Sequence, residues 1–117
     1  MEINEVSFEN NLPVTGYGTG FFRIGTSIFK GNRFIYKNKI FDWDGFSNSK
    51  IILRNSSEID VLFVGTGPDI KNIPSEFKKC IEKHGIGIEI MSTPTACRTY
   101  NVLLGEGRRI GAALLAL

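Results

Sequence analysis

The side chains with the greatest chemical capability gather between residues 92 and 108. Cys97 lies in the first turn of a predicted helix and is followed by Arg98. Both the helix dipole and a neighbouring cation lower the pKa of a thiol, so this position allows a reactive thiolate. A cysteine hydrolase also needs a base, and the only histidine, His84, ends a different predicted helix. We therefore interpret Cys97 as a small buried residue, with nucleophilic catalysis as the less favoured alternative.

Three more polar residues follow the cysteine closely, namely Asn101, Glu106 and Arg108. Asn101 shares the helical face of the cysteine, and Glu106 lies in a Gly-Glu-Gly turn. The group suits a pocket for a small molecule or an anion. The structural alternative is that Glu106 pairs with a nearby arginine and Asn101 hydrogen-bonds backbone groups at the junction between helix and strand. Acid–base catalysis would need a second carboxylate, and Asp69 and Glu89 belong to other elements, so no catalytic residue is assigned.

A glycine turn, Gly65-Thr66-Gly67, follows the clearest strand of the chain. A dinucleotide-binding turn has a third glycine, but Ile70 occupies that position, and the Lys and Ser/Thr ending of a P-loop is absent. A simple turn is therefore favoured, although the carboxyl ends of strands in open α/β sheets do line ligand clefts. One histidine and two cysteines outside any CxxC motif do not supply a usual zinc site, so no metal or cofactor is expected.

The elements that would position these residues begin with hairpins in the first half of the chain. Short apolar runs broken by turn residues predict strand pairs at 21–24 with 27–30 and at 33–36 with 39–43. We interpret residues 15–57 as an antiparallel β meander that folds over one side of the main sheet. Within it, the run Ile51-Ile52-Leu53 is expected to form a short strand. Residues 1–14 have a poorly determined pattern that allows an edge strand.

The second half, residues 58–117, alternates strands with helices. We expect a strand at 59–64, a helix from 73 to a stop at Gly85, a strand at 86–91, a helix beginning at Ser92 or Thr93, and a strand at 109–117. Gly87 and Glu89 share one face of the predicted strand at 86–91, which indicates a position near the sheet edge. Small residues at 111–113 allow close packing on both faces, which indicates a central last strand. This β-α-β-α-β order predicts an α/β fold in three layers.

The composition fits one globular domain over residues 1–117. Hydrophobic residues make up 42% of the chain, and its length is too small for two independent cores. A net charge of +2 and scattered basic residues argue against nucleic-acid binding. The N-terminus lacks the pattern of a secretory or transit peptide, and no apolar run is long enough to span a bilayer. With two cysteines interpreted as reduced thiols, these features predict a soluble cytoplasmic protein.

Four segments carry a resemblance to a known family. They are Val64-Gly65-Thr66-Gly67, residues 85–89, residues 93–103 and Glu106-Gly107-Arg108. Because of them, most of residues 15–117 resembles a small α/β family that includes mitochondrial respiratory complex I assembly factor three and the adipogenesis-associated domain protein. The chain looks like an uncharacterised bacterial member.

The resemblance implies a central mixed sheet of five strands, with the last strand antiparallel to the rest, and no established enzymatic activity. It favours a non-enzymatic interaction protein that assists the assembly of a respiratory membrane complex, the type I NADH dehydrogenase. Subunits or assembly proteins of that complex would be its partners and would hold it at the inner membrane as a peripheral protein. The oligomeric state is left undecided, with a homodimer as one alternative. The alternative is a small-molecule or anion-binding domain. The corresponding pocket residues are Gly65, Thr66, Gly67, Thr93, Cys97, Asn101, Glu106 and Arg108.

Overall fold

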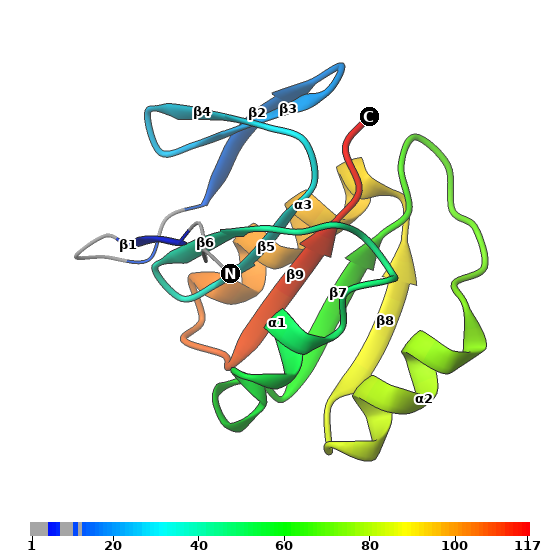
Figure 1. Ribbon diagram of the computed structural model, residues 1–117. Helices are drawn as coiled ribbons and strands as arrows, with labels where there is room; N and C mark the ends of the chain where they lie inside the picture. Colours follow the sequence, from blue (N-terminus) through cyan, green and yellow to red (C-terminus); the bar gives the residue numbers. More distant parts are fainter. Residues whose placement is uncertain (1–4, 8–10, 12) are drawn as a thin grey trace.

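The computed structural model describes residues 5–7, 11 and 13–117, which form two β-sheets and three α-helices (Figure 1). The strands are β1 (Glu5–Ser7), β2 (Val14–Gly18), β3 (Phe21–Ile24), β4 (Ser27–Lys30), β5 (Arg33–Tyr36), β6 (Lys39–Asp42), β7 (Val61–Gly65), β8 (Gly87–Met91) and β9 (Ile110–Leu114). The helices are α1 (Lys50–Leu53), α2 (Ser75–Lys83) and α3 (Thr93–Leu104), with a 3₁₀ turn at Ser56–Glu58. The central sheet has the order β1-β6-β5-β9-β7-β8, and the second sheet has the order β2-β3-β4.

The expected α/β fold in three layers is confirmed. On one face of the central sheet, α3 and the second sheet enclose a hydrophobic core that contains Phe22, Phe63 and Tyr100. On the other face, α1 and α2 enclose a second core that contains Ile52 and Phe77. Five strands in the order β6-β5-β9-β7-β8 form the expected mixed sheet, and β1 extends it at one edge. Of the predicted N-terminal segment, residues 1–4, 8–10 and 12 lie outside the described residues.

The last strand is central, as its small residues predicted. β9 lies between β5 and β7, and a Cβ added to Gly111 would come within 3.2 Å of Ile59 and 3.3 Å of Phe34. Its direction differs from the expectation. β9 runs parallel to β7 and is antiparallel to its other neighbour, β5. The reason is the α3 crossover, which returns the chain to the end of the sheet where β8 began, so that β8 and β9 run the same way.

The predicted meander is shared between the two sheets. Phe34, Ile35 and Tyr36 of β5 are all buried, because β5 is covered on both faces within the central sheet. In contrast, β3 alternates buried and accessible side chains, as expected for a strand with one packed face. The predicted strand at 51–53 is wrong, since these residues form α1 and bury Ile51 and Ile52. Periodicity cannot separate helix from strand in so short an apolar run.

The two long helices lie close to their predicted positions, although α2 begins at Ser75, two residues after the predicted start. α2 follows Pro74 and stops before Gly85, whose φ of +84° is costly for other residues. α3 begins after Ser92, whose hydroxyl accepts a hydrogen bond from the Thr95 N–H at 3.4 Å. α3 is 12 residues long. Within the described ranges, no helix has the length and apolarity that a bilayer-spanning helix requires.

Candidate functional site

Thr93 joins three backbone segments at the carboxyl ends of β7, β8 and β9. Its side chain is fully buried, and its hydroxyl donates to the Leu115 carbonyl and accepts from the Gly67 N–H, both at 2.8 Å. The Thr93 N–H also donates to the Gly67 carbonyl at 2.8 Å. The packing requires glycine at position 65, because a Cβ there would lie 2.8 Å from the Thr93 Oγ1 and 2.9 Å from its Cα. Thr93 therefore fixes the turn after β7 relative to the start of α3.

Thr66 organises the loop that leads from this turn to α2. Its N–H donates to the Met91 carbonyl at 3.0 Å. Its buried hydroxyl donates to the Asp69 carbonyl at 2.7 Å and accepts from the Lys71 N–H at 3.0 Å. The residues on both sides of Ile70 are thus hydrogen-bonded to one hydroxyl, while Ile70 itself is 65% exposed. The loop presents a large apolar side chain to solvent from a backbone that is held in place.

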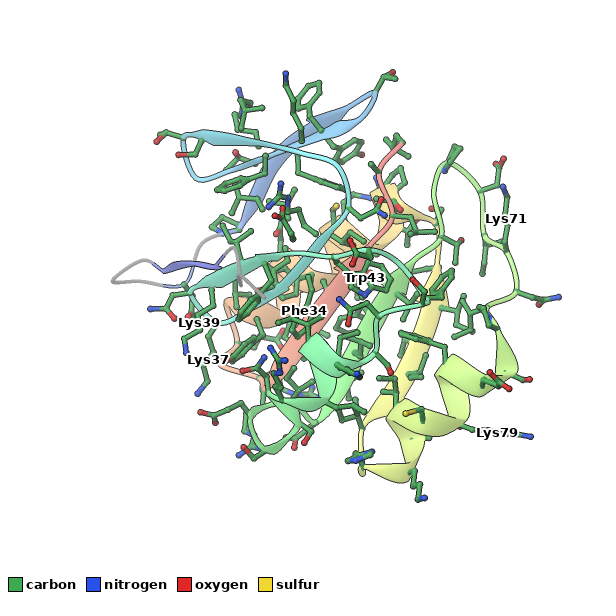
Figure 2. All side chains as sticks on the ribbon, viewed as in Figure 1. Phe34, Lys37, Lys39, Trp43, Lys71 and Lys79 are labelled. Carbon is green, nitrogen blue, oxygen red and sulfur yellow. The ribbon has the colours of Figure 1, made fainter. Side chains whose placement is uncertain are left out.

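A groove of about 400 Å³ lies between this loop and β8. It is lined by Ile70, Lys71, Asn72 and Ile90. Figure 2 shows Lys71 on the loop, which projects beyond the carboxyl end of the sheet. None of these four residues belongs to the pocket predicted from the sequence. The signal that was present is a large apolar residue, Ile70, among polar residues in the loop ahead of the predicted helix.

Cys97 is buried, and its surroundings oppose ionisation. Burial raises the pKa of the Cys97 thiol to about 12, and the opposing effect of Arg98 is smaller. The alternative in which the helix dipole and Arg98 lower the pKa of the Cys97 thiol is therefore wrong. His84 is exposed, and its Nδ1 lies 2.9 Å from the Cys80 carbonyl oxygen. Since α2 and α3 cover opposite faces of the sheet, His84 is not placed to act as a base for Cys97.

Asn101 has a structural role. Its side-chain Oδ1 accepts from the Val14 N–H and its Nδ2 donates to the Val14 carbonyl, both at 2.8 Å. This pair of hydrogen bonds ties β2, and with it the second sheet, to α3. The structural alternative predicted that Asn101 forms hydrogen bonds with backbone groups, and this is confirmed. The backbone groups belong to β2, however, and not to the junction between helix and strand.

Glu106 and Arg108 are exposed in the loop between α3 and β9. This loop precedes β9, whereas Thr93 contacts the residue that follows β9. A helix of the length of α3 spans roughly 18 Å. The structure therefore brings together Gly65, Thr66, Gly67 and Thr93, and it places Cys97, Asn101, Glu106 and Arg108 progressively farther along α3 and its following loop. The part of the chain that the structure describes holds no group of three His, Cys, Asp or Glu side chains arranged for a metal ion.

Comparisons with known proteins give a consistent result. A family model described as "Protein of unknown function (DUF498/DUF598)" matches residues 14–115. An uncharacterised protein from Rhodobacter capsulatus is 40% identical over 117 residues, which cover 100% of this chain and 94% of that protein. A crystal structure described as an outer membrane protein from Bartonella henselae is similar with a TM-score of 0.84 and 32% identity, covering 93% of this chain and 98% of that one.

A human protein named NADH dehydrogenase (ubiquinone) 1 alpha subcomplex assembly factor 3 is also similar. It is 28% identical over 111 residues, which cover 89% of this chain and 60% of the human protein. This chain therefore spans about 60% of the length of the human relative.

Proposed function

The chain belongs to the DUF498/DUF598 family, and from this premise we propose that it is a non-enzymatic interaction protein that assists the assembly of a respiratory membrane complex. The complex is the type I NADH dehydrogenase, whose subunits or assembly proteins are the proposed partners. Through them the chain would be held at the inner membrane as a peripheral protein. The names of related proteins motivate the choice of complex, since one relative is named as an assembly factor for an NADH dehydrogenase.

The observation that carries the proposal is the exposed Ile70 beside the groove. Ile70 is 65% exposed, on a loop that Thr66 holds by hydrogen bonds to Asp69 and Lys71. A large apolar side chain on a fixed loop loses little conformational freedom when a partner covers it, which favours protein binding. Single exposed apolar residues are common, and the fixed loop and adjoining groove are what distinguish Ile70.

The small-molecule alternative has less support. Its four central residues, Cys97, Asn101, Glu106 and Arg108, are spread along α3 and the loop that follows it. Both Asn101 hydrogen-bonding atoms are used by Val14. A ligand at this position would therefore compete with contacts that hold the second sheet to α3.

Affinity capture combined with gene deletion tests the proposed function. The host is a bacterium that has a type I NADH dehydrogenase and a member of this family. We expect the tagged chain to capture subunits or assembly proteins of the complex, and a strain without the family member to lose NADH:quinone activity in its membranes. A plasmid copy of this chain should restore the activity. Capture of none of these proteins, together with normal membrane activity in the deletion strain, would contradict the proposal.

A further inference from the structure

The outer edge of β8 offers backbone groups for strand pairing. Among the described strands, β8 pairs with β7 alone. Gly87 donates its N–H to the Asp60 carbonyl at 2.9 Å, so its backbone groups face β7. Because these groups alternate in direction along a strand, those of Ile88 and Ile90 face away from β7. No hydrogen bond between described residues uses them. An unpaired edge of this kind is a template for an added strand.

The groove adjoins this free edge. Ile90 lines the groove, and its outward backbone groups belong to the edge. Ile70 faces it from the loop that Thr66 fixes. An extended segment lying along β8 would therefore form backbone hydrogen bonds and place one side chain in the groove at the same time. Main-chain bonds supply affinity in this binding mode, and pockets for alternate side chains supply specificity.

Charges on the two sides of β8 indicate what the added segment would carry. Lys71 is the charged residue that lines the groove. Glu89 is exposed and lies on the opposite face of β8, because neighbouring side chains on a strand alternate between faces. We propose that the β8 edge binds an extended protein segment with an apolar side chain for the groove, an acidic residue near Lys71 and a basic residue near Glu89. This inference rests on the proposed interaction function and names the chemistry of its partner.

A second copy of this chain fits the edge less well. Antiparallel pairing of two β8 strands that uses the outward groups of Ile88 and Ile90 from both copies would place Ile88 opposite Ile90. The two Glu89 side chains would then lie directly opposite each other, and like charges in that position are destabilising. A segment with a basic residue there avoids this repulsion.

Peptide selection with matched variants tests the side-chain part of the inference. Random displayed peptides long enough to span β8 are selected on the wild-type protein, and the enriched peptides are synthesised for affinity measurement. We expect Ile70→Asp to weaken binding about tenfold, because an exposed isoleucine loses its apolar contact. Val102→Asp is the matched control, since Val102 is 64% exposed on α3 compared with 65% for Ile70. It should leave the affinity unchanged.

A charge exchange tests the role of Lys71. Lys71→Glu should weaken binding about fivefold for one reversed contact near the surface, and replacing the acidic residue of the peptide by lysine should restore it. Lys79→Glu, on the outer side of α2 (Figure 2), is the control and should have no effect. Peptides that bind Ile70→Asp as tightly as the wild type would overturn the groove assignment.

Hydrogen exchange of the backbone amides tests strand addition itself. We expect the Ile88 and Ile90 amides to exchange at least tenfold more slowly in the peptide complex. Enriched peptides that leave both amides unprotected, or a selection that enriches no peptide, would overturn the inference. Protection of both amides in a wild-type homodimer without peptide would assign the edge to a second copy instead. Capture of respiratory proteins that is equal for wild type and Ile70→Asp would contradict this inference and leave the proposed function standing.

Discussion

Replacing Thr93 by valine removes one hydroxyl without changing the shape of the side chain. In the wild type this hydroxyl pairs the buried Gly67 N–H and the Leu115 carbonyl, each at 2.8 Å. Leaving a buried donor unpaired costs about 1–3 kcal/mol, and the second lost hydrogen bond contributes about 1 kcal/mol. We therefore expect Thr93→Val to lower the free energy of unfolding by about 3 kcal/mol, which corresponds to a Tm lower by roughly 10 °C for a domain of this size.

Urea unfolding followed by circular dichroism measures this change. Thr93→Ser is the control, because it keeps the hydroxyl and removes one methyl group, for an expected loss of about 1 kcal/mol. The reasoning would be refuted if Thr93→Val unfolded within about 0.5 kcal/mol of the wild type, or if serine cost as much as valine, because the hydroxyl would then contribute little.

Three further predictions concern α3. The Cys97 thiol should react with a thiol reagent only after unfolding, unlike the partly exposed Cys80. Because burial raises the pKa of Cys97 from 9.0 to about 12, the unfolded state loses this proton first. The contribution of Cys97 to the free energy of unfolding should therefore be fully present below about pH 9 and be lost as the pH rises toward 12. Urea unfolding at two pH values should show a smaller decrease in Cys97→Ala than in the wild type. Asn101→Ala removes both bonds to Val14. The variant should lower the free energy of unfolding by about 2 kcal/mol and speed amide hydrogen exchange in β2–β4 but not in α2. Unchanged exchange in β2–β4 would contradict the role assigned to Asn101. Tyr100→Phe removes a buried hydroxyl that has no partner among the described residues. Its thermal unfolding should show equal or higher stability, and a loss above about 1 kcal/mol would contradict the prediction.

The features that the sequence predicted correctly depend on short-range patterns. Pro74 and Gly85 bracket α2, and Ser92 caps α3, so each boundary is visible within a few residues. The alternation of strands and helices after residue 58 similarly fixes the layers. Small side chains around Gly111 indicated a central β9, because only such residues allow close packing on both faces.

The candidate site could not be predicted in the same way, because its contacts join distant segments. Asn101 pairs with Val14, 87 residues away, and no local pattern reveals that partner. Thr66 and Thr93 fell within the predicted pocket, and their hydroxyls form hydrogen bonds with backbone groups of distant segments that no local pattern indicates. The exposure of Ile70 depends on the hydrogen bonds that hold its loop, which periodicity does not encode.

The most direct test of protein binding through the Ile70 groove is quantitative capture by three forms of the chain. Wild type, Ile70→Asp and Val102→Asp are expressed with the same tag in a host that has a type I NADH dehydrogenase, and captured proteins are quantified by mass spectrometry. We predict that wild type and Val102→Asp capture the same subunits or assembly proteins. Ile70→Asp should lose about nine tenths of them, as a tenfold lower affinity implies when the tagged chain is present well below the dissociation constant. Equal capture by all three forms, or capture of no respiratory protein by any of them, would contradict the claim.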